Sequence, residues 1–126
     1  MNLKILTGML LIGAGLGSAL TSAIWAQSRP PAYIVAEVTV NDPDVFAKEY
    51  GPKLPATLQP FGGRFIVAGG KLTALEGDTP QRFVIIGFEN AEKARAWYDS
   101  PAYQALIPIR QKASKGTLFI AEGVAN

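Results

Sequence analysis

Two segments of this chain have the side-chain pattern of β-strands, and each leads directly into a signal that starts a helix. Residues 33–40 (YIVAEVTV) alternate between two faces and are rich in β-branched side chains, and residues 82–89 (RFVIIGFE) are strongly apolar. Asp42, which precedes a proline, and Asn90 follow these segments, and both residue types cap helix N-termini. The strand-then-helix order therefore occurs twice, which constrains the chain to a sheet packed against helices.

The first predicted helix begins at Pro43 and carries apolar side chains at helical spacing as far as Leu58. Gly51 and Pro52 interrupt this pattern, so we expect a break or kink near Gly51 and a second helical piece from Pro52. Gly62 and the glycine after it then end the helical region, because glycine readily adopts the left-handed conformation of a C-terminal cap.

The second predicted helix restarts part of the way along. It spans residues 91–99, begins again with Ser100 as the cap and Pro101 at the first helical position, and runs to residue 113. We expect Gly116 to end it. The remaining predicted elements are a strand at 64–68 that continues at 71–75 after a bulge or bend at the glycine pair 69–70, a turn at 76–80 and a last strand at 117–122.

The resulting order, β-α-β-β-α-β, is that of the ferredoxin-like fold. This α+β class gives residues 33–124 a four-stranded antiparallel sheet with two helices on one face and an open second face. The open face would expose Val35, one of Phe83 and Val84, and one of Phe119 and Ile120. Because a contiguous apolar surface usually marks an interface, we predict a homodimer through the open sheet face, a dimeric α/β barrel.

The N-terminal segment is typical of a secretory signal peptide. Lys4 is the only charged residue among the first 28, and an apolar stretch and then small residues follow it. We predict a signal peptide at 1–26, cleaved after Ala26 or alternatively after Ala23, and a polar mature tail at 27–32. The alternative is an uncleaved anchor at residues 5–26, which is long enough to cross a bilayer. Both interpretations place the domain in the periplasm, and cleavage would leave it without stable membrane association.

The absence of histidine and cysteine from all 126 residues excludes several kinds of chemistry. Disulfides, thiol catalysis and histidine-dependent triads are impossible, and haem loses its usual axial ligands. The carboxylates are dispersed, so we expect no metal site and no cofactor. The net charge of +2 comes without a clustered basic face, which argues against nucleic-acid binding.

Several stretches of the mature chain resemble one family of small bacterial proteins, the domain-of-unknown-function family 1330. The matching stretches are YIVAEVTVNDPDVFAKEY, PATLQPFGGRFIVAGGK, LEGD, RFVIIGFEN, YDSPAYQALIPIR and GTLFIAEGV. The family is similar to the dimeric α/β-barrel superfamily, which agrees with the fold expected from the pattern. The resemblance implies no particular reaction.

The candidate functional residues are aromatic, basic and acidic. An arginine beside phenols suits a small carboxylate or an aromatic acid, although tyrosines at such positions also serve to pack the core. We therefore expect an exported homodimer that binds a small organic ligand between sheet and helices. One alternative is a cofactor-independent monooxygenase or isomerase, with tyrosine, arginine or a desolvated Glu37 in acid–base work, and another is a non-catalytic assembly module that uses the open sheet. The candidate ligand-binding residues are Glu37, Tyr50, Arg64, Tyr98, Tyr103 and Arg110.

Overall fold

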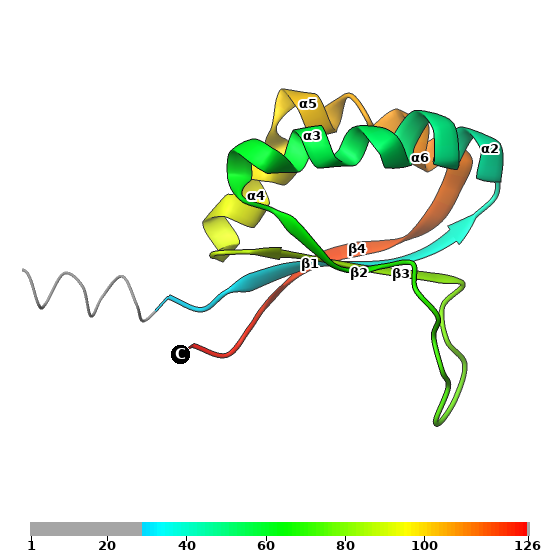
Figure 1. Cartoon of the computed structure of the whole chain (residues 1–126), viewed down its shortest axis with the longest axis horizontal. Coiled ribbons are helices and arrows are strands. Elements are labelled where there is room, and N and C mark those ends of the chain that lie inside the picture. Colours follow the sequence, from blue (N-terminus) through cyan, green and yellow to red (C-terminus); the bar gives the residue numbers. More distant parts are fainter. Residues whose placement is uncertain (1–28, 126) are drawn as a thin grey trace, which may run out of the picture. The chain divides into compact units, whose positions relative to one another are not determined.

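The computed structural model describes residues 29–125, in which four strands form one antiparallel sheet in the order β2-β3-β1-β4. Helices cover one face of this sheet (Figure 1). The predicted α+β, ferredoxin-like class is therefore confirmed. The predicted signal peptide at 1–26 lies outside the described residues, and no helix within residues 29–125 is long and apolar enough to cross a membrane. The strands are β1 Ala32–Val40, β2 Arg64–Ala68, β3 Arg82–Phe88 and β4 Ser114–Glu122.

Strand alternation and register decide which side chains face the helices. Ile34 of β1 lies opposite Ile86 of β3 and Ile120 of β4, and all three point toward the helical layer. Phe83 pairs with Glu37 and Phe119 pairs with Val35, so both aromatic rings lie on the open face. The register thereby selects Phe83 and Phe119 from the alternatives that the alternation left open.

The first helical segment changes its winding at the predicted position without being interrupted. Asp42 caps it, since its Oδ1 accepts a hydrogen bond of 3.2 Å from the backbone N–H of Val45. A π-helical turn precedes Gly51 and a 3₁₀ turn begins at it, because Pro52 has no N–H to continue the α-helical ladder. Gly62, at φ 69°, ends the segment as predicted. Its parts are α2 Pro43–Val45, η1 Phe46–Tyr50, η2 Gly51–Lys53, α3 Leu54–Leu58 and η3 Gln59–Phe61.

The second helical segment confirms both predicted caps. The Oδ1 of Asn90 accepts from the backbone N–H of Lys93 at 2.9 Å, and the Oγ of Ser100 accepts from that of Tyr103 at 3.3 Å. The helix runs to residue 113 as predicted, but the predicted role of Gly116 in ending it is wrong, because Gly116 lies within β4 opposite Val38. The parts of this segment are α4 Ala91–Asp99, α5 Pro101–Gln104 and α6 Ile107–Ala113.

The predicted continuation of β2 through residues 71–75 is also wrong. The chain leaves the sheet at Gly69, whose φ of 73° belongs to the left-handed region. Residues 69–81 then form a long loop that projects from the sheet on the side away from the helices (Figure 1). The irregularity expected at the glycine pair lies earlier, where the register shifts between Phe65 and Val67.

Trp97 of α4 lies at the centre of the core and joins the helices to the sheet. Its ring centroid is 4.0 Å from that of Tyr103 and 5.8 Å from that of Phe88 on β3. Its Nε1–H donates to the Oγ1 of Thr57 at 3.0 Å, and this hydroxyl donates to the carbonyl of Leu54 at 2.7 Å. The indole thus satisfies its single polar group inside the core.

Candidate functional site

A cavity of about 110 Å³ lies between the helical layer and the helix-facing side of the sheet. Its sheet wall is apolar, because β1 and β3 contribute Ile34, Ala36, Val84 and Ile86. Most of its polar groups come from four side chains of the two helical segments and of β3. These are Tyr50, Arg82, Tyr103 and Arg110.

Two tyrosines meet at one end of this cavity. The Oη of Tyr50 lies 2.9 Å from the Oη of Tyr103, and the two residues are 6% and 0% exposed. Burial raises the pKa of Tyr50 well above its usual value, and the neighbouring Tyr103 raises it further. The guanidinium groups of Arg110 and Arg82 lower it only in part. Tyr50 therefore presents a neutral hydroxyl to the cavity near neutral pH.

Two arginines line the same cavity. The Nε atoms of Arg82 and Arg110 are buried, and neither has a hydrogen-bond acceptor in the described part of the protein. A buried donor without an acceptor costs about 1–3 kcal/mol, and more when it is charged. The two groups therefore favour an anionic acceptor inside the cavity.

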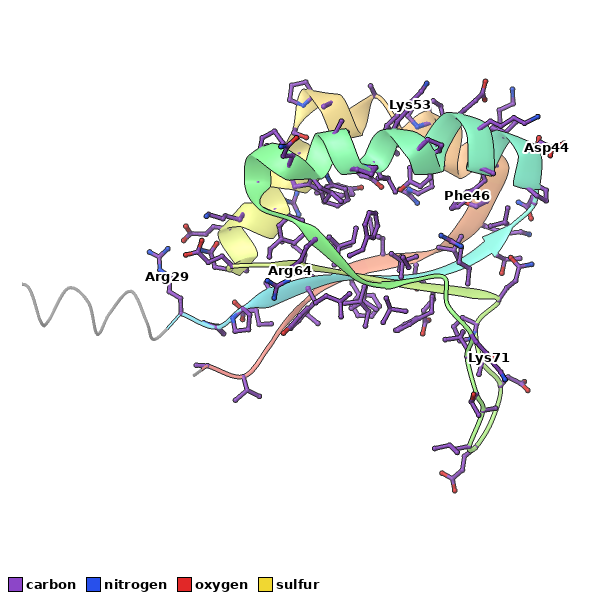
Figure 2. The ribbon with its side chains drawn as sticks, viewed as in Figure 1. Arg29, Asp44, Phe46, Lys53, Arg64 and Lys71 are labelled. Atoms are coloured by element: carbon purple, nitrogen blue, oxygen red, sulfur yellow. The ribbon has the colours of Figure 1, made fainter. Side chains whose placement is uncertain are left out.

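Arg82 is held in place by an aromatic ring and a glycine. Its guanidinium carbon lies 5.4 Å from the centroid of the Phe46 ring, in a cation–π arrangement. Figure 2 shows Phe46 on the sheet-facing side of the first helical segment. A Cβ added at Gly69 would come within 2.6 Å of the same guanidinium carbon, so the arginine needs the space that glycine leaves.

The structure brings three of the six predicted site residues together. Tyr50, Tyr103 and Arg110 all line the cavity. Glu37 and Arg64 lie on the open face of the sheet, opposite Phe83 and Gly87 respectively, and so are separated from the cavity by the sheet itself.

Tyr98 also lies apart from the cavity. Its ring centroid is 5.7 Å from that of Tyr103, but it faces a separate shallow pocket beside β4. The guanidinium carbon of Arg95 lies 5.9 Å from the Tyr98 ring centroid. The site predicted from the sequence is therefore assembled in part, and Tyr98 lies outside it.

Arg82 is the site residue that the sequence interpretation missed. A signal for it was present, because Arg82 alternates with Val84 and Ile86 along one strand. The sequence left the orientation of that strand open, so the alternation alone did not show that Arg82 faces the helices. Acidic side chains form no group that could hold a metal ion anywhere in residues 29–125.

The buried Tyr50 hydroxyl should make the free energy of unfolding decrease in alkali, and Tyr50→Phe should reduce this decrease. Because the folded-state pKa lies above the unfolded value of about 10, the native state keeps a proton that the unfolded chain releases. The contribution of this hydroxyl to the free energy of unfolding is fully present below about pH 10 and declines above it by about 1.4 kcal/mol per pH unit. Urea unfolding between about pH 9 and pH 11 should show the steeper decline in the wild type. Equal slopes in both proteins would contradict the burial of this hydroxyl.

Two solved structures with TM-scores above 0.6 support the fold. RPA0582, a protein of unknown function from Rhodopseudomonas palustris, is similar to this chain with a TM-score of 0.62 at 15% identity, covering 86% of this chain and 94% of that one. The methylated form of RPA0582 gives a TM-score of 0.61 at 17% identity, with 76% and 82% covered. The cofactor-independent oxygenase SnoaB from Streptomyces nogalater gives 0.46 at 14% identity, with 73% and 91% covered.

Sequence comparison assigns the family. No curated protein matches this chain. The sequence model of the family described as Domain of unknown function (DUF1330) matches residues 31–124, which is most of the chain and agrees with the resemblance found in its motifs. The chain belongs to the DUF1330 family.

Proposed function

We propose that this protein binds a small anionic organic molecule, a carboxylate, in the cavity between its helices and its sheet. The observation that supports the proposal is the pair of buried Nε–H groups, on Arg82 and Arg110, without protein acceptors. A carboxylate would accept hydrogen bonds from both groups, and such charge-assisted bonds are the stronger ones. The Tyr50–Tyr103 hydroxyl pair offers a further donor beside them.

The cavity restricts the ligand to a short molecule. An enclosed apolar cavity of about 150 Å³ accommodates benzene. The volume of about 110 Å³ here therefore favours a ligand of about four to six non-hydrogen atoms. The apolar wall of Ile34, Val84 and Ile86 suits a short alkyl chain on the carboxylate. A short aliphatic monocarboxylate combines both properties.

Two further parts of the proposal concern the setting of this site. The signal-peptide pattern at 1–26 supports export to the periplasm. The open face of the sheet supports a homodimer, because Ile66 and Phe119 are each 48% exposed there. Two copies packed through these faces would bury both patches and leave the cavity, on the other side of each sheet, available to ligand.

The geometry supports ligand binding better than acid–base catalysis. Glu37, the carboxylate among the acid–base candidates of the enzymatic alternative, lies on the other face of the sheet from the cavity. Tyr50 has a raised pKa, so its phenol holds a proton at neutral pH and serves as a hydrogen-bond donor, not as a base. The described cavity residues therefore provide recognition of an anion and no carboxylate general base.

Thermal-shift titration with short carboxylates tests the proposal. Acetate, propionate and butyrate should raise the melting temperature, and the corresponding neutral amides at matched ionic strength should not. Arg82→Met and Arg110→Met should each weaken carboxylate binding by about tenfold or more, because each removes a hydrogen bond from a charged donor. The matched control is Arg95→Met, since Arg95 forms a surface ion pair with Asp99. Carboxylate binding that survives both cavity substitutions, or equal binding of the amides, would refute the site.

A further inference from the structure

The loop of residues 69–81 between β2 and β3 projects from the sheet, with a backbone hydrogen bond at its base and a turn at its tip. At its base the backbone N–H of Gly69 donates to the carbonyl of Phe83 at 3.0 Å. At its tip Gly77 has a φ of 72°, a turn conformation that glycine adopts without strain. The loop extends beyond the sheet on the side of the open face, and Figure 2 shows Lys71 on it, well away from the helices.

The tip of this loop carries an apolar side chain that the single copy does not bury. Leu75 is 94% exposed, which is more than any other large apolar side chain of the described residues. Glu76 and Asp78 flank the turn, and neither belongs to an ion pair within residues 29–125. Leu75 therefore lies beside acidic residues on a long projection, where its side chain is accessible to another molecule.

We infer that each loop packs against a second copy of this chain and buries Leu75 on the partner's surface. We call this contact the loop contact. The inference rests on the proposed homodimer through the open sheet faces. Because the loop projects on the same side as the open face, any molecule that covers that face lies beside the loop (Figure 1).

The charges of the chain favour a second copy as the partner in the loop contact. Glu76 and Asp78 make the loop tip acidic. Arg64 and Lys115 lie on the open face by register, since they pair with Gly87 and Thr39, and Glu37 lies on the same face opposite Phe83. A second copy therefore presents basic residues, together with the apolar face, to an acidic tip.

Sedimentation equilibrium of the wild type and of Leu75→Asp tests the inference. The substitution should raise the dimer dissociation constant about tenfold or more, because burial of a leucine side chain is lost and a charge is added. Leu75 is exposed in the single copy, so the variant is expected to fold as the wild type does. Ala96→Asp is the control, since it adds the same charge to an exposed position of α4 in the helical layer and should leave the constant unchanged.

A labelling experiment makes the test independent of the charge. The chain contains no cysteine, so Leu75→Cys provides one site for an environment-sensitive dye. Its emission should shift to the blue as the dimer forms on concentration. A monomeric wild type would refute both the proposed homodimer and the loop contact. If the wild type is a dimer, an unchanged dissociation constant in Leu75→Asp together with no shift of the dye's emission would refute the loop contact alone.

Discussion

Replacing Trp97 with alanine should lower the free energy of unfolding by about 3–5 kcal/mol, the range for removing a buried tryptophan. The indole is 1% exposed and packs against Tyr103 and Phe88, so the surrounding side chains cannot close the space that it leaves. The substitution also removes the donor to Thr57. Urea denaturation followed by far-ultraviolet circular dichroism measures the loss.

Trp97→Phe separates ring packing from the hydrogen bond. Phenylalanine keeps an aromatic ring beside Tyr103 but lacks the N–H group. Thr57 still donates to the carbonyl of Leu54, so the loss of its second partner should be tolerated in part. We expect a cost of about 1–2 kcal/mol for this variant. A cost below about 1 kcal/mol for Trp97→Ala would contradict the central packing of this ring.

Replacing Gly116 with alanine should cost about 3 kcal/mol, the upper end of the range for overpacking. An added Cβ would overlap the carbonyl oxygen of Glu37 and lie 2.9 Å from the Cα of Val38. Both obstacles are backbone atoms of β1, so no side chain can move aside and β4 must shift as a whole. Thermal unfolding should show a decrease in melting temperature of about 12 °C or more.

Gly70→Ala is the matched control for this prediction. No heavy atom lies within 4 Å of the Cβ position at Gly70, and its φ is outside the left-handed region. The control should be neutral or slightly stabilising, because alanine restricts the unfolded chain. If Gly116→Ala melted at the temperature of Gly70→Ala, the close approach of β4 to β1 at this point would be wrong.

Local sequence signals predicted the elements well where the deciding interactions span a few residues. Asp42, Asn90 and Ser100 cap helices because each side chain reaches a backbone N–H three residues further along the chain. Gly62 ends a helix through its own φ angle. These contacts depend on adjacent residues alone, so a pattern in the sequence suffices to find them.

The predictions of secondary structure that were wrong concern glycines, which occur in helix caps, turns and closely packed strands alike. Gly116 was expected to end a helix, yet it lies in β4 because the neighbouring strand leaves no room for a side chain. Gly69 was expected to mark a bulge or bend inside a longer strand, but it starts a loop and makes space for the guanidinium of Arg82. In both cases the reason is a contact with a segment that is distant in the sequence.

The sequence by itself determined the order of strands and helices, the helix caps, the family and the lack of thiol and imidazole chemistry. Only the tertiary structure decided which arginines join the tyrosines. Arg82 and Arg64 both lie at strand starts, but the register of β3 with β1 turns Arg82 toward the helices, and that of β2 with β3 turns Arg64 to the open face. Successive side chains of a strand alternate between faces, so the cross-strand register, a long-range property, determines the composition of the site.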